Sequence, residues 1–221
     1  ARTSKYDNLL RYEGYELILK ILRYLYQIDA YISIAEVARE RGFVFAEALP
    51  LGGNILEIEG MFHPLIENAI PNSIQADAEH NVVFLTGANM AGKSTFMKTF
   101  GIVVYLAHMG FPLPVKKMRF SVQNGMYTTI NLPDNMMLGY SHFYAEVQRL
   151  KKVAEQVGRI GNLVIVFDEL FRGTNVKDAH EATLAVMEAF AEKKNCIFMI
   201  STHIIEAGED LKKRCDNISY V

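Results

Sequence analysis

The sequence contains few cysteines and carries little net charge of either sign. Its two cysteines, Cys196 and Cys215, lack Cys-x-x-Cys spacing, which argues against a disulfide scaffold or a zinc site. We therefore expect a reducing, cytosolic compartment. With 23 basic and 25 acidic residues, the net charge of -2 gives no overall field that would attract nucleic acid or an anionic membrane. Any contact with DNA must then be local.

Long apolar runs are also missing. The most apolar stretch, residues 101–115, is interrupted by His108, Gly110, Pro112 and Pro114, so it is too short and broken to span a bilayer. The N-terminus has no signal-peptide pattern, and we expect no membrane partner. Half of the residues are apolar, which is ample for a packed core. Because the chain begins with alanine and ends in a strand-like segment, we expect it to be part of a longer protein.

The pattern of apolar residues predicts two regions. In residues 5–41 apolar side chains recur every three or four positions, which predicts helix ending at Gly42. We therefore assign residues 1–42 to a helical segment and residues 43–221 to one α/β domain. Residues 43–80 contain Gly52, Gly53 and three prolines, and they predict turns and short strands that form a wall of a site.

From residue 81 onward, strand and helix patterns alternate, which predicts a mostly parallel sheet covered by helices on both faces. Strands are expected at residues 81–86, 163–167 and 196–200. The side chains expected to face inward from the intervening helices are Phe96, Phe100, Val103, Ala107, Val147, Leu150, Ala154, Val157, Ala182, Val186, Ala189 and Phe190.

A phosphate-binding signature, GxxxxGK(S/T), follows the first of these strands and opens a helix. Backbone N–H groups of such a loop surround phosphate oxygens, and the helix adds the positive end of its dipole. The lysine contacts the β- and γ-phosphates, and the serine hydroxyl binds Mg²⁺. The predicted nucleotide-binding residues are Gly87, Ala88, Asn89, Met90, Ala91, Gly92, Lys93, Ser94 and Thr95.

Two acids end the next apolar strand pattern. Asp168 and Glu169 directly follow residues 163–167, and a buried strand tolerates acids there when its end opens onto a cation or water. We expect Asp168 to join Ser94 in the Mg²⁺ shell, and Glu169 to accept a proton from the attacking water. His203 follows the third strand pattern, at the same sheet edge, within reach of a γ-phosphate.

These residues resemble the ATPase domain of the MutS family of DNA mismatch repair proteins, a branch of the ATP-binding-cassette (ABC) class of P-loop NTPases. The Asn89-Met90 pair inside the loop is similar to the family's distinctive Asn-Met pair. Residues 168–174 resemble its Asp-Glu motif, residues 201–203 its Ala-Thr-His motif, and residues 59–64 its EGRHP motif. Pro71 and Asn72 resemble a stretch near which the family holds adenine.

The resemblance implies further roles. It implies a Mg²⁺-dependent ATPase that binds ATP and ADP and works as a homodimer in DNA mismatch repair or a related DNA transaction. DNA would be bound by regions outside this chain. Ser141 is similar to the signature serine that contacts the γ-phosphate held by a second subunit, although it also suits a helix N-cap. Asp178 corresponds to the acid that follows the Asp-Glu motif.

Three departures from the family pattern leave other functions open. Ala88 replaces a proline, Ala91 replaces a glycine, and Phe171 replaces the glycine after the Asp-Glu-hydrophobic triplet. One alternative is therefore a nucleotide-gated scaffold that hydrolyses little ATP. A transport or chromosome-structuring ABC ATPase fits less well because the LSGGQ signature is absent. A P-loop kinase lacks support, because no lid arginines or acceptor pocket can be identified.

Overall fold

The computed structural model describes residues 2–87, 91–130, 142–171, 174–202 and 205–221. The chain divides into two compact units, Ala1–Phe43 and Val44–Val221. In the first unit, Gly14 separates the helical residues Arg2–Asn8 (α1) and Leu9–Glu13 (a π-helical turn) from the long helix α2, Tyr15–Arg41. Gly42 ends α2 with a φ of 67°, a left-handed conformation that glycine adopts without strain.

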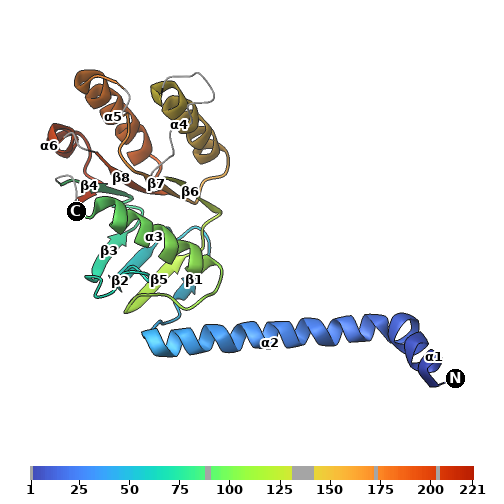
Figure 1. The fold of residues 1–221 in the computed structure, drawn as a ribbon. Helices are drawn as coiled ribbons and strands as arrows, with labels where there is room; N and C mark the ends of the chain where they lie inside the picture. Colours follow the sequence, from blue (N-terminus) through green and yellow to red (C-terminus); the bar gives the residue numbers. More distant parts are fainter. Residues whose placement is uncertain (1, 88–90, 131–141, 172–173, 203–204) are drawn as a thin grey trace. The chain divides into compact units, whose positions relative to one another are not determined.

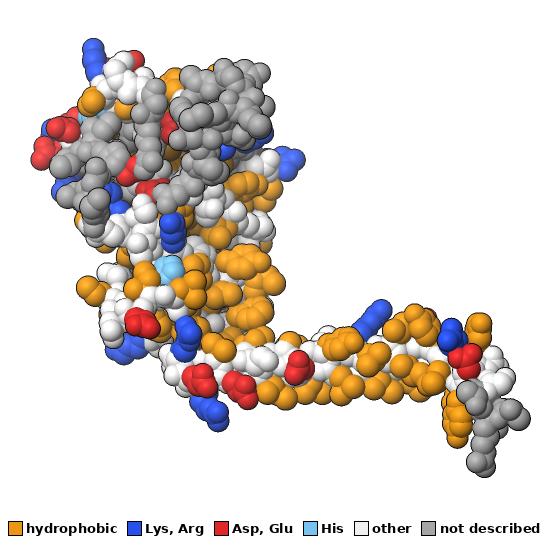
Figure 2. Space-filling model, in the orientation of Figure 1, with side chains coloured by type: hydrophobic (Ala, Val, Ile, Leu, Met, Phe, Trp, Pro, Cys, Tyr) orange, Lys and Arg blue, Asp and Glu red, His pale blue; other side chains and the backbone are white. Residues whose placement is uncertain are grey.

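No described side chain of α2 is buried. Large apolar side chains on this helix are instead exposed, among them Leu17, Leu25, Ile28 and Tyr31. Figure 2 shows apolar side chains along much of its length. Even so, none of the helices in the described ranges combines the length and apolar character that a membrane span requires.

In its described residues, the second unit contains two sheets and four helices (Figure 1). The five-stranded sheet, in the order β6-β7-β8-β4-β9, is parallel throughout. Its strands are Gly125–Thr129 (β6), Leu163–Phe167 (β7), Ile197–Ser201 (β8), Val82–Leu85 (β4) and Ile218–Tyr220 (β9). The helices are Lys93–His108 (α3), His142–Arg159 (α4), Val176–Ala191 (α5) and Ile205–Arg214 (α6).

A second, four-stranded sheet was not anticipated from the sequence. Its order is β1-β5-β2-β3, and only the β1–β5 pair is parallel. Its strands are Glu47–Leu49 (β1), Lys117–Ser121 (β5), Leu56–Met61 (β2) and Asn72–Ala76 (β3). The expectation of short strands in residues 43–80 is therefore confirmed, but together with β5 these strands build a separate sheet.

Alternating side chains of the parallel sheet divide the core into two layers. Val83 and Leu85 on β4 face α3 and the four-stranded sheet, where Phe100 is fully buried. Val82 and Phe84 face the opposite layer, which α4, α5 and α6 cover (Figure 1). A strand buried on both faces reads as a continuous apolar run, which explains why β4, β7 and β8 were recognisable in the sequence.

Candidate functional site

The carboxyl ends of β4, β7 and β8 form one edge of the parallel sheet. Leu85 on β4 lies in register with Ser201 on β8, and Phe167 on β7 lies in register with Ile200. Because these strands run in the same direction, the residues that follow them, including Gly87 and Asp168, meet at this edge. The sequence thus brings phosphate loop and acids together through strand pairing.

The carboxylate of Asp168 is held by two serine hydroxyls. Ser94 Oγ, on the first turn of α3, donates to Oδ2 at 2.7 Å, and Ser201 Oγ donates to Oδ1, also at 2.7 Å. Asp168 is only 9% exposed, and a buried carboxylate needs such partners to offset its desolvation. One acid therefore ties α3 to the ends of β7 and β8.

Ser201 also fixes the second acid. Its oxygen accepts a hydrogen bond from the backbone N–H of Glu169 at 3.0 Å, while its proton goes to Asp168. Ser201 is fully buried at the last position of β8. In the sequence, Ser201 stood out only as part of the segment that resembles the Ala-Thr-His motif. Its position, a small polar residue ending an apolar strand beside two acids, is the signal that identifies it.

Glu169 has an unusual backbone conformation. Its φ is 55°, in the left-handed region that few residues other than glycine and asparagine adopt, and the residue is 8% exposed. Such a conformation costs about 1–3 kcal/mol and persists only where the surroundings impose it. The Ser201 hydrogen bond is one such constraint.

The first turn of α3 faces the same edge. Gly92 is the N-cap with a φ of 94°, so no side chain occupies the cap position in front of the helix. Lys93 begins the helix, and its Nζ donates to the carbonyl oxygen of Gly87 at 2.6 Å. The lysine side chain therefore spans the two ends of the loop. The helix's first N–H groups and its positive dipole end suit an anion here.

A mainly apolar hollow of about 440 Å³ adjoins this loop. It is walled by the end of β2, the segment after it, the end of β4, the first turns of α3, and Val221. Lining residues include Met61, Phe62, His63, Ile70, Asn72, Lys93 and Phe96. The hollow is apolar, contains aromatic side chains and lies beside a positively charged position that suits an anion. It therefore has the chemistry to hold a planar base next to phosphates.

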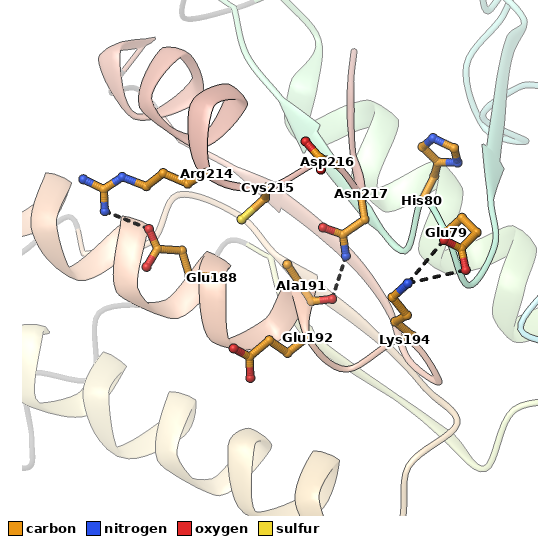
Figure 3. Close-up of a pocket in the computed structure, with 10 residues that line it drawn as sticks. All are labelled: Glu79, His80, Glu188, Ala191, Glu192, Lys194, Arg214, Cys215, Asp216 and Asn217. Carbon is orange, nitrogen blue, oxygen red and sulfur yellow. Dashed lines mark hydrogen bonds and ion pairs between the residues drawn. The ribbon is translucent and has the colours of Figure 1, made fainter.

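A larger hollow of about 730 Å³ lies elsewhere (Figure 3). It is formed by residues at the amino ends of β4, β8 and β9, the edge opposite Asp168. Two ion pairs lie there: Arg214 binds Glu188 at 2.8 Å, and Lys194 binds Glu79 at 3.2 Å. Glu188 accordingly raises the pKa of the Arg214 guanidinium. Among the described residues, none of those predicted for function lines this hollow, so we place the candidate site at the carboxyl edge.

The other predicted residues divide into three groups. Ala91, Gly92 and Thr95 are exposed around the start of α3. Asp178 lies on the first turn of α5, where its N–H donates to Asn175 Oδ1 at 3.0 Å and its carboxylate accepts from Asn175 Nδ2 at 2.6 Å. This arrangement caps α5. Ala88, Asn89, Met90, Ser141 and His203 lie outside the described residues.

The oxygen atoms of Ser94 and Asp168 suit a cation that takes its remaining ligands from phosphate and water oxygens. Within the described ranges, no group of three or more His, Cys, Asp or Glu side chains is arranged to hold a metal. Ser94 Oγ and Asp168 Oδ2, 2.7 Å apart, are both hard oxygen donors. Mg²⁺ is commonly bound by one or two carboxylates together with substrate phosphates and water, so these residues fit it.

The structure thus defines an α/β protein with a parallel, helix-flanked sheet and a candidate site at the carboxyl edge of that sheet. Residues 83–220 match the family model described as MutS domain V. The match covers more than half of the chain, which therefore belongs to the MutS domain V family, as the motifs indicated.

Several curated relatives are named DNA mismatch repair protein MutS. The one from Desulforamulus reducens is 30% identical over 199 residues, covering 87% of this chain and 22% of the relative. Those from Thermus aquaticus and Aquifex pyrophilus are 31% and 32% identical, covering 86% and 83% of this chain and 23% and 21% of the relatives. The chain therefore spans about a fifth to a quarter of the length of these relatives.

Proposed function

We propose that residues 43–221 form a P-loop ATPase domain of the ABC class, which binds ATP with Mg²⁺ and hydrolyses it. One observation carries this proposal. Asp168, buried at the end of β7, is hydrogen bonded both to Ser94 in the first turn of α3 and to Ser201 at the end of β8. This contact supports the proposal, because the proposed phosphate loop, cation ligands and second acid would then share one edge of the sheet.

The phosphates would lie against the first turn of α3. The N–H groups of the first turn and the dipole of the helix favour negative charge, and Lys93 supplies a full positive charge beside the loop. Its hydrogen bond to the Gly87 carbonyl keeps the ammonium group over the loop. An arriving triphosphate would compete for that ammonium group. The remaining loop residues, Ala88 to Ala91, would contribute backbone N–H groups.

Ser94 and Asp168 would hold Mg²⁺. When bound, the cation would neutralise phosphate charge and help to orient the triphosphate. The base would enter the 440 Å³ hollow beside the loop, where Phe62 and His63 are the aromatic candidates for stacking. Adenine, rather than guanine, is proposed from the family resemblance.

Glu169 would act as the general base. Its N–H is fixed by Ser201, so the backbone that carries the carboxylate is set before a substrate arrives. A positioned base typically contributes about 10²–10⁴ in rate. His203, two residues after Ser201, is proposed to contact the γ-phosphate. Ser141 and Asp178 are proposed to act at the interface of a homodimer.

In the whole protein, this domain would serve as an ATP-dependent switch. The relatives' names support a role in DNA mismatch repair or a related DNA transaction. DNA would be bound by regions outside this chain. ATP would draw two domains together and hydrolysis would release them.

Steady-state ATPase activity with Mg²⁺, measured over a wide range of protein concentration, tests the proposal. We expect specific activity to rise with concentration, because the proposed site is shared between subunits. Lys93→Ala should lower kcat/KM by about 10²–10³, a loss typical of removing one charge-stabilising donor. Lys98→Ala, an exposed lysine on the same helix, should leave it unchanged.

Glu169→Gln should retain ATP binding while kcat falls by about 10²–10⁴. Glu192→Gln, an exposed acid distant in sequence from the site, serves as the matched control. Normal turnover in the Glu169 variant would disprove the base assignment. ATP binding without turnover in the unmodified chain would favour the nucleotide-gated scaffold instead.

A further inference from the structure

Phe171 lies in a backbone conformation that a phenylalanine rarely adopts. Its φ is 61°, and it stands three residues after Asp168 and two after Glu169, whose φ is also positive. Two non-glycine residues of one short turn are therefore strained. Such strain persists only where the surrounding structure holds the residues in place, so the turn must be anchored.

The Phe171 side chain supplies an anchor. It is 4% exposed, and its ring lies 5.9 Å from the ring of Phe143, centroid to centroid, with an interplanar angle of 47°. Phe143 belongs to the first turn of α4. Burial of an aromatic ring against another aromatic ring is a large favourable contribution, which offsets the strained backbone.

The turn is thereby fixed at successive residues. Ser201 holds the N–H of Glu169 at 3.0 Å, Leu170 packs against the core layer under α4, α5 and α6, and Phe171 packs on Phe143. The first two contacts connect the turn to the sheet and its covering layer. The contact with Phe143 connects it to the first turn of α4.

We propose that Phe171 is a positioning residue, which sets the orientation of Glu169 and couples it to the first turn of α4. This inference rests on the proposed role of Glu169 as the base. A shift of α4 would pull on the Phe171 ring, and the two-residue separation would carry that displacement to the Glu169 backbone. Glycine at position 171 would relieve the strain but remove the coupling.

Kinetics of variants in the full chain test this role. Phe171→Gly and Phe143→Ala should each lower kcat by about 10- to 100-fold, because small misplacements of reacting groups are costly, while KM for ATP changes less than about twofold. The double variant should be no slower than the slower single variant, since both remove one shared contact. Phe143→Leu, which keeps an apolar contact, should recover most of kcat.

Val153→Ala is the matched control. Val153 is a buried residue of α4, and it packs in the core layer that Leu170 also contacts. Unlike Phe143, it has no aromatic ring to pair with Phe171. Its truncation should lower the unfolding temperature and leave kcat unchanged. This comparison requires that the unmodified chain hydrolyses ATP. If Phe171→Gly and Phe143→Ala then keep kcat within about twofold of its value, the positioning role of Phe171 is wrong.

Amide hydrogen exchange separates this inference from the proposed function. The Glu169 N–H should exchange at least about tenfold faster in Phe143→Ala than in the unmodified protein, and Val153→Ala should not change it. This readout needs no turnover. Should the chain fail to hydrolyse ATP, faster exchange would still support the coupling, and unchanged exchange would overturn it.

Discussion

The single hydroxyl group of Ser201 makes hydrogen bonds to both acids, Asp168 and Glu169. It donates to Asp168 Oδ1 and accepts from the Glu169 N–H, and it is fully buried. A hydroxyl is the smallest side-chain group that can donate and accept at once. An alanine could do neither, and a larger polar residue would not fit a strand end packed on both faces.

Ser201→Ala should therefore lower the stability of the fold and the rate of the proposed ATP hydrolysis. It leaves the buried Glu169 N–H without this partner and removes one of the two serine donors to Asp168, at a cost of about 1–3 kcal/mol. For a chain of this size each kcal/mol corresponds to about 2–4 °C in unfolding temperature. Thermal unfolding monitored by circular dichroism measures the change. Ser73→Ala, which removes an exposed hydroxyl that accepts from Gly60 N–H, should shift the temperature less.

At the scale of elements, the junction between the phosphate loop and α3 depends on Gly92. Its φ of 94° lies outside the regions open to residues with a Cβ atom. A substitution there is strained even though no atom of the described residues, other than those of its chain neighbours, lies within 4 Å of the added carbon. The backbone, and not the available space, requires glycine.

Gly92→Ala should cost about 1–2 kcal/mol and move the start of α3 relative to Gly87. Isothermal titration with ATP and Mg²⁺ should show weaker binding than for the unmodified protein. Gly158→Ala is the matched control, because this helical glycine of α4 has no positive φ and space for a methyl group, and alanine favours helix there. If the unmodified protein, Gly92→Ala and Gly158→Ala bind ATP with equal affinity, glycine is not required at position 92.

Several elements were predictable because their signals are local. The apolar run 163–167 is β7, and the strand expected at 196–200 is shifted by one residue to Ile197–Ser201. Gly42 ends α2 as expected. Phe100, Val103 and Ala107 of α3 are buried as predicted. A continuous apolar run or a glycine cap carries its meaning without knowledge of the rest of the fold.

The orientation of α4 and α5 was predicted less well. Val153 is buried where Ala154 was expected, and on α5 Leu184 and Met187 are buried whereas Ala189 is exposed. Alanine fits either face of a helix, so the larger side chains decide which face turns inward. The left-handed turn at Glu169 and Phe171 was missed for a related reason, since only non-local contacts hold it in place.

At the scale of the whole molecule, the two core layers lie entirely within Val44–Val221. A protein of residues 44–221 should therefore fold alone. We expect cooperative thermal unfolding within a few degrees of the full chain, and unchanged affinity for ATP. Circular dichroism and titration calorimetry provide the measurements. A non-cooperative transition would show that residues 1–43 are required for folding.

Light scattering supplies a second comparison. Exposed apolar side chains such as Leu25 and Tyr31 on α2 favour non-specific association. The weight-average molar mass from light scattering, divided by the mass of one chain, should accordingly be lower for residues 44–221 than for the full chain at equal molar concentration. A higher ratio for the shorter protein would indicate that its own surface is the main source of association.

The position of β4 has a consequence for the order of events during synthesis. This strand precedes the phosphate loop, yet its neighbours β8 and β9 come more than 100 residues later, and Thr86 N–H reaches the carbonyl oxygen of Val221. A ribosome releases the loop long before the strands that hold it. The nascent chain is therefore unable to assemble this edge of the sheet until Val221 has left the exit tunnel, and the proposed nucleotide site would form only after that.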